Sequence, residues 1–358
     1  MIHETLDSLI ERVLKEHDRK VDMLADTRRM SIEAVGVGDP DAGKNVELTV
    51  DETEGLSRLI MSEHSLGQMA TDLGIPKRYF DRMKVDAPDL FRSNVHHWMY
   101  QEPKRRMLRA YNQGGEFLTG RAWLSDRYRR LDNIEIATKL LPEFDRLPQE
   151  PQFHNASITD ERFYLRAVFP GMEREVKVGD AVQWGVQIRN SEVGAATFAI
   201  ESFVLRLVCS NGMVVAKVLN ARHIGKRLDD ILSDEAVEAD DHAFWLAARD
   251  TLRASLDEAA FEETVEKLRG TTEGTRIESA PQATKRLAKT FSLSDEEQET
   301  VLTNLVREGD LSRWGMLNAV TATAATVDSF DRGVELEEAG WSIATLSRRD
   351  WDRIAVAA

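Results

Sequence analysis

Several residue groups have types and spacings that could support chemistry. The segment Gly38–Lys44 has the GxxxxGK spacing of loops that hold phosphate on backbone N–H groups and a lysine. The next residue is Asn45 rather than the Ser or Thr that would bind magnesium, and a strand-like VELTV follows where such a loop needs a helix. This pattern favours a hairpin turn, with a nucleotide-dependent enzyme as a third-ranked alternative.

The histidines and the single cysteine show no catalytic or metal-binding spacing. The eight histidines, which include the pair His96 and His97, form no HxH or HExxH pattern. Cys209 lies in the apolar run FVLRLVCSNGMVV, where a thiol is more often packed than nucleophilic. No GxSxG motif is present. We therefore expect no enzyme activity, no metal and no cofactor.

A basic and aromatic stretch is the strongest functional signal. The formal net charge of the chain is −15, yet the segment from Lys77 to Arg130 holds thirteen Lys and Arg against six Asp and Glu. Four of the five tyrosines fall in the same segment. Cations neutralise phosphates and aromatic rings stack on exposed bases, so this mixture is typical of single-stranded nucleic-acid binding.

We predict a groove in which cations hold phosphates and two tyrosines stack on bases. The alternative is that the aromatic residues belong to the core while the arginines pair with acidic helices. The most acidic segment, 228–266, has thirteen acids and two arginines, and we expect it to occupy the groove when nucleic acid is absent. The predicted binding residues are Lys104, Arg105, Arg106, Arg109, Tyr111, Arg127, Tyr128, Arg129 and Arg130.

The first part of the chain predicts alternating helices and hairpins. Residues 5–30 have the apolar spacing of an amphipathic helix, and SIEAVGVG and NVELTV have the composition of two paired strands. Residues 52–84 predict two or three short helices, with Gly74 ending one and Pro76 opening the next. The spacing of Gln68, Ala70, Leu73, Gly74 and Ile75 resembles a helix-turn-helix, which ordinary helix packing also explains.

The middle of the chain predicts a sheet, and its end predicts helices. The run RRMLRAYNQGGEFLTGRAWLS indicates a hairpin, and the following DRYRRLDNIEIATKLLPEF, residues 126–144, indicates a helix. Further strand segments continue to about residue 227, and acidic helical sequence follows. We therefore predict an α+β fold, an antiparallel sheet with a hairpin-plus-helix core flanked by helices in residues 1–227, followed by an acidic, mostly helical region in residues 228–358.

The N-terminus, the apolar runs and the predicted edge strands indicate the compartment and the assembly. The N-terminus is charged from its third residue and has no apolar signal region, and no long apolar run is present. These features predict a cytoplasmic protein with no membrane partner. Edge strands and the amphipathic first helix favour a homo-oligomer.

Three separated motifs carry a resemblance to a known family. The runs WLSDRYRRLDN, NSEVGAATFAIESFVLRLVCSNGM and WGMLNAVTATAA, with LGIPKRYFDRM before them, resemble the phage/plasmid-like protein family over about residues 45–345. That family is a domain of unknown function found on prophages and plasmids, and its core is similar to the fold of phage single-strand annealing proteins. The resemblance implies a non-enzymatic protein of a mobile element that binds or anneals single-stranded DNA in recombination. A protein-interaction or counter-defence factor is the alternative.

Overall fold

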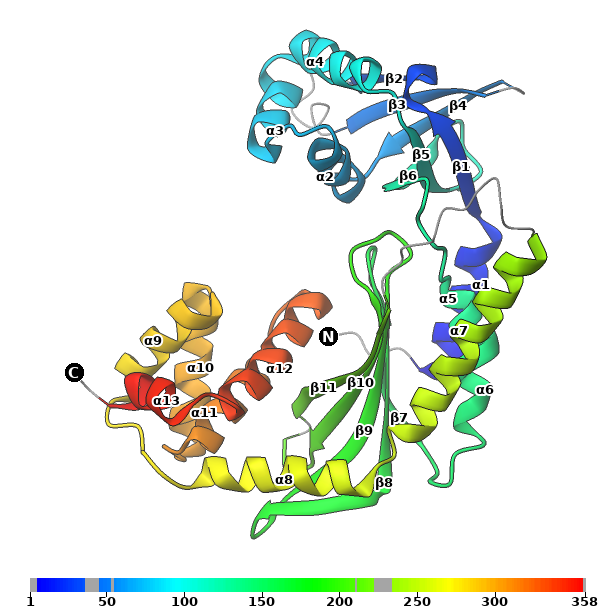
Figure 1. Ribbon diagram of the computed structural model, residues 1–358. Coiled ribbons are helices and arrows are strands. Elements are labelled where there is room, and N and C mark those ends of the chain that lie inside the picture. The colour runs from blue at the N-terminus through cyan, green and yellow to red at the C-terminus, as the bar shows by residue number, and fades with distance from the viewer. Residues whose placement is uncertain (1–4, 36–44, 53–54, 210, 222–233, 357–358) are drawn as a thin grey trace.

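The computed structural model describes residues 5–35, 45–52, 55–209, 211–221 and 234–356, so the Gly38–Lys44 motif lies outside the described residues. The fold is α+β, as the sequence predicts. Two separate sheets, one above the other in Figure 1, each have helices packed beside them.

The first sheet has six strands in the order β1-β5-β6-β4-β3-β2. Neighbouring strands are antiparallel except β4 and β6, which are parallel. The expected pairing of SIEAV with NVELTV is the β2–β3 pair, and the expected hairpin around Gly114 is β5–β6. The strands are β1 (Lys20–Asp26), β2 (Met30–Val35), β3 (Asn45–Glu52), β4 (Gly55–Met61), β5 (Arg105–Tyr111) and β6 (Leu118–Ser125).

Three helices cover one face of this sheet: α2 (Glu63–Asp72), α3 (Lys77–Asp86) and α4 (Pro88–Gln101). Their buried side chains form one core with the strands, in which the rings of Phe80 and Phe91 meet edge to face at 4.9 Å. The predicted turn between the first two helices is confirmed. Gly74 has a φ of +67°, which favours glycine, and Pro76 is the N-cap of α3.

The second sheet is an antiparallel meander with the order β11-β10-β9-β8-β7. Helix α1 (Leu6–Asp18) and the helical segment 133–144, made of α5 (Asn133–Glu135), η3 (Ile136–Leu140) and α6 (Leu141–Phe144), pack beside it. The strands are β7 (Gln152–Ile158), β8 (Phe163–Lys177), β9 (Asp180–Asn190), β10 (Phe198–Arg206) and β11 (Asn211–Ala221).

The C-terminal part is helical, as predicted, and packs into the core of the second sheet. Phe198 of β10 contacts Trp245 with ring centroids 5.6 Å apart, and Trp184 of β9 contacts Phe261 at 5.2 Å. The division expected at 227/228 therefore falls within a single hydrophobic core. The helices are α7 (Asp234–Ala254), α8 (Glu258–Thr272), α9 (Ala280–Phe291), α10 (Asp295–Glu308), α11 (Arg313–Thr323), α12 (Phe330–Ala344) and α13 (Arg348–Ala355).

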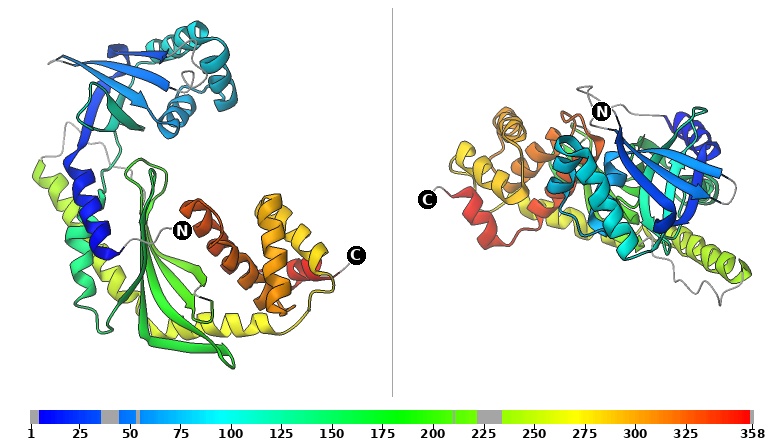
Figure 2. Two further views of the ribbon diagram at one scale, coloured as in Figure 1. Left: turned by 180° about the vertical axis from the view of Figure 1, so that it is seen from behind. Right: turned by 90° about the horizontal axis from the view of Figure 1, so that it is seen from above.

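The helices that pack on the first sheet and the last helices of the chain lie on the same side of the molecule. Helices α2–α4 and α9–α13 lie to the left of the sheets in Figure 1 and to the right in the reverse view of Figure 2. Helices α1, α5, α6 and α7 lie on the opposite side. None of the described helices is long and apolar enough to cross a membrane.

Two predicted elements near the N-terminus are wrong. The helix expected over residues 5–30 ends at Asp18, and residues 20–26 form an edge strand paired with β5. The alternation of Val21, Met23 and Ala25 suits a strand, and pairing with β5 outweighs helix propensity. Strand β4 was missed because its GLSRLIM sequence, rich in leucine, lacks the β-branched pattern of the neighbouring strands.

The helix predicted over residues 126–144 begins only at Asn133. Residues 126–132 form the connection between the two sheets, and Tyr128 in it donates a hydrogen bond to the backbone oxygen of Ser191 at 2.8 Å. Asp132 then caps the helix in a capping box with Glu135. A strong N-cap in the middle of the predicted helix fixes its start seven residues later than expected.

The histidine pair lies on α4, and one of the two holds a strand in place. Nε2 of His96 accepts a hydrogen bond from the backbone N–H of Ile32 at 2.9 Å. Burial, aided by the charge of Arg92 and opposed by Glu33, lowers the pKa of His96 below 6.5. Only the neutral ring can accept this bond.

We predict that His96 makes folding pH-dependent. As the pH falls below about 6.5, the unfolded chain takes up a proton that the folded ring resists, so the free energy of unfolding decreases until the folded pKa is passed. His96→Gln keeps an acceptor without titrating and should flatten the pH dependence in that range. Urea unfolding of both proteins at several pH values measures it, and identical slopes would exclude the effect.

Candidate nucleic-acid interface

Most cations of the basic stretch are used in ion pairs. Of the thirteen Lys and Arg between residues 77 and 130, ten have an acidic side chain within 4.0 Å. Among the described residues, Arg78, Arg105 and Arg127 have no such partner. The local excess of positive charge is therefore largely neutralised by acids from elsewhere in the fold.

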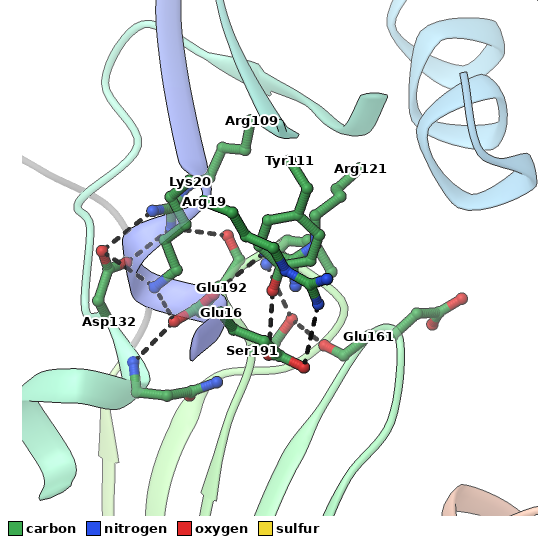
Figure 3. Close-up of polar contacts among 12 residues, drawn as sticks. Glu16, Arg19, Lys20, Arg109, Tyr111, Arg121, Asp132, Glu161, Ser191 and Glu192 are labelled. Carbon is green, nitrogen blue, oxygen red and sulfur yellow. Dashed lines mark hydrogen bonds and ion pairs between the residues drawn. The ribbon is translucent and has the colours of Figure 1, made fainter. Parts of the chain in front are cut away.

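Arg109 is the centre of a buried network where the two sheets meet (Figure 3). Its side chain is 1% exposed and lies 2.9 Å from the carboxylate of Asp22 and 2.8 Å from that of Asp132. It also donates a hydrogen bond to the backbone oxygen of Glu192 at 3.0 Å. A phosphate could reach this guanidinium only by breaking those contacts, so Arg109 holds the fold together.

Glu192 supplies the second half of the network. Its carboxylate is ion-paired with Lys20 and with Arg121, the latter at 3.2 Å, and it accepts a hydrogen bond from the backbone N–H of Asn133 at 2.8 Å. Burial opposes its ionisation, but Lys20 leads the interactions that keep the pKa of Glu192 below its ordinary value.

Asp132 is also kept ionised by neighbouring cations, against the effect of burial. Burial opposes its ionisation, and Arg109 and then Lys20 outweigh burial and lower its pKa to about 2. The three cations Lys20, Arg109 and Arg121 thus face the three carboxylates of Asp22, Asp132 and Glu192, so these six charges balance one another.

Tyr111, which was predicted to stack on a base, and Arg106, which was predicted to bind phosphate, are both buried in contacts within the fold. Tyr111 is 8% exposed, donates a hydrogen bond to Glu16 at 3.0 Å and lies under the guanidinium of Arg121 at 3.9 Å. Arg106 is 8% exposed and makes a bidentate ion pair with Asp72, the last residue of α2. Neither side chain is free to contact a base or a phosphate.

Arg129 contacts the acidic helix α7. Its guanidinium lies 2.6 Å from Asp241 and 3.2 Å from Asp240, and 4.9 Å from the ring centre of Phe244. One of the predicted binding arginines is thus ion-paired with the acidic segment. Tyr128 beside it is part of the packed connection between the sheets.

Four predicted residues remain at the surface: Lys104, Arg105, Arg127 and Arg130. In the β5–β6 pair Arg106 lies opposite Ser125, so Arg105, which begins β5, and Arg127, which follows β6, are at the same end of the hairpin. Arg130 is 3.5 Å from Asp22 and Lys104 is 3.5 Å from Glu102.

Sequence reasoning did not single out two exposed aromatic residues near this end. Tyr79 of α3 and Trp98 of α4 are 45% and 43% exposed, and both line a surface pocket that Lys104 also lines. The only sign of them in the sequence was their position in the aromatic stretch. They differ from Phe80, Phe91 and Trp123 in being exposed rather than buried, and the sequence pattern alone did not reveal this difference.

The arrangement defines a two-sheet α+β protein with a neutral buried joint and a small exposed basic and aromatic surface. A family model described as a domain of unknown function, DUF932, matches residues 122–342. This is more than half of the chain, which therefore belongs to the DUF932 family. No curated protein and no solved structure matches. The pocket residues precede the matched region.

We predict that Arg109 is essential for stability. Arg109→Met removes the main cation of Asp22 and Asp132, which then keep only Arg130 and Lys20 at 3.5 Å, and it should lower the free energy of unfolding by about 3–5 kcal/mol. Arg127→Ala, at an exposed site, is the control and should change it by about 0.5 kcal/mol or less. Urea unfolding measures both, and an Arg109→Met protein as stable as wild type would contradict this role.

Proposed function

We propose that the chain binds single-stranded nucleic acid without breaking bonds, on a surface formed by α3, α4 and the start of β5. The observation that carries the proposal is the exposure of Tyr79 and Trp98 around one pocket with Lys104. Arg78 and Arg105 are next to these residues in the chain, are exposed and have no acidic side chain within 4.0 Å among the described residues, although Arg105 lies opposite Asp26 in the β1–β5 pair.

The chemistry of this surface suits single strands better than a duplex. Exposed aromatic rings stack on bases only where the bases are unpaired, and such stacking is worth about 1–3 kcal/mol per base. Few cations are free, so the electrostatic contribution comes from a small number of phosphate contacts. We expect Lys104, Arg105, Arg127 and Arg130 to take phosphates along the end of the hairpin.

We further propose that the protein belongs to a mobile element and acts in the cytoplasm, which the resemblance to phage/plasmid-like proteins supports. Its role there would be to anneal or protect single-stranded DNA in recombination, and this needs no catalytic residue. A homo-oligomer would place several such surfaces along one strand. The buried arginines then act by holding the surface in place.

Helix α7 is a candidate regulator of this binding. Asp240 and Asp241 pair with Arg129, which is two residues after the exposed Arg127. Carboxylates this close oppose the approach of a phosphate backbone. In this proposal the acidic helix weakens binding at the arginines of the connection between the sheets.

The runner-up is a protein-interaction or counter-defence factor, and one observation favours it. Val85 of α3 and Leu90 of α4 are apolar side chains that are 60% and 48% exposed. Exposed apolar side chains of this kind are common in protein contacts. Binding to a protein partner would depend weakly on salt, whereas binding to nucleic acid depends on it strongly.

We predict salt-sensitive binding that prefers single strands. Fluorescence anisotropy with single-stranded and duplex DNA of matched length, at two salt concentrations, should show tighter binding of the single strand and a loss of affinity at higher salt. Trp98→Ala should weaken binding about tenfold, and Gln101→Ala, at an exposed position on the same helix, should not. Absence of binding at low salt would refute the proposal and favour a protein partner.

A second prediction tests the acidic helix. Replacing Asp240 and Asp241 by Asn removes two negative charges from beside Arg129 and should raise the affinity for single-stranded DNA severalfold. The matched control is Glu258→Gln and Glu263→Gln on α8. An affinity that rises equally in both variants would indicate a general charge effect, and an unchanged affinity would exclude regulation by these two aspartates.

A further inference from the structure

The pocket beside Trp98 has the dimensions and walls of a small-molecule site. Its volume is about 520 Å³, which falls within the range of ligand pockets. The turn between α2 and α3 forms one side, and α4 with the start of β5 forms another. The lining residues are Asp72, Leu73, Gly74, Ile75, Pro76, Tyr79, Asn94, Trp98, Glu102 and Lys104.

Helix α4 and its C-cap residue supply three lining residues. Asn94 and Trp98 are four residues apart, about one turn of helix, and Glu102 is the C-cap residue that follows the helix. Tyr79 comes from the first turn of α3. Two aromatic rings and one amide thus reach the pocket from two different helices.

The amide of Asn94 is an uncommitted polar group in the pocket, whereas the charged side chains that line it are paired. Both carboxylate oxygens of Asp72 accept hydrogen bonds from Arg106, and one of them also accepts from the indole of Trp123 at 3.0 Å. Glu102 and Lys104 pair with each other at 3.5 Å. Asn94 is half-buried, and its amide has no hydrogen-bond partner among the described residues.

We propose that this pocket receives one unstacked base of a single strand, and that the base it selects is adenine. This inference rests on the proposed function and names its specificity. An asparagine amide donates and accepts side by side, which matches the ring nitrogen and exocyclic amino group of adenine. Tyr79 and Trp98 supply stacking surface, and a purine offers a larger face than a pyrimidine. Lys104 at the rim is placed for the adjoining phosphate.

The size of the base separates adenine from thymine. The carboxylates of Asp72 and Glu102 are already paired with Arg106 and Lys104, so the larger stacking face of a purine carries this preference. Guanine presents two adjacent acceptors on its outer edge, which an amide satisfies less well than an arginine does. The pocket therefore discriminates among bases although the rest of the surface binds the backbone without regard to sequence.

The test uses the full chain and thymine tracts that differ at one central position. Anisotropy competition compares a tract of thymines with the same tract carrying one adenine, one guanine or one abasic site at its centre. We expect the adenine tract to bind about fivefold to tenfold more tightly than the all-thymine tract, and the abasic tract most weakly. Asn94→Ala should remove the preference for adenine, so that the adenine tract and the all-thymine tract bind this variant with affinities that differ less than twofold.

The controls separate this inference from the proposed function. Gln101→Ala should keep the preference, and far-ultraviolet circular dichroism with urea unfolding should show that Asn94→Ala is folded. Equal affinity for all central bases, a preference for guanine, or a preference that survives Asn94→Ala would overturn the inference and leave single-strand binding intact. Failure of every tract to bind would refute the proposed function itself.

Discussion

The buried ion-pair network around Arg109 is the interaction on which the arrangement of the two sheets depends. It joins β1 and β5 of the first sheet to the connection at Asp132 and to the Glu192 loop of the second sheet. Each charge in it would be costly to bury alone, and removing one partner leaves the others uncompensated. The network thus tolerates few changes and holds the exposed surface of α3 and α4 at a defined position relative to the second sheet.

The same network explains why charge in the sequence is a poor guide to charge on the surface. A local excess of arginine suggests a polyanionic partner, but Asp22 and Glu192, far from Arg109 in the chain, neutralise it in space. What is left is a small set of unpaired cations near two exposed aromatic rings. Under the proposed function, a single strand bound there would obtain more of its affinity from stacking than from counterion release.

The region that matches the family and the candidate binding surface lie in different parts of the chain. The DUF932 match covers the second sheet and most of the C-terminal helices, and it includes Asp132 and Glu192 of the buried joint. Arg109 of that joint and the aromatic pocket belong to the preceding part of the chain. The acidic helix α7 lies in the matched region and contacts Arg129 of the connection. The part that defines the family is thus joined to the candidate binding surface through the connection between the sheets.

Local sequence determined much of this protein. Local patterns identified β2, β3 and the β5–β6 hairpin, and Gly74 and Pro76 marked the break between α2 and α3, because each of these signals acts over a few residues. Strand β1 and the late start of α5 were decided by tertiary structure, since edge pairing with β5 and the capped, ion-paired Asp132 involve distant partners. The site follows the same division. The sequence located the basic and aromatic stretch, but only the folded chain decided which of its side chains are buried in ion pairs and which are exposed, because burial and pairing depend on residues brought together from far along the chain.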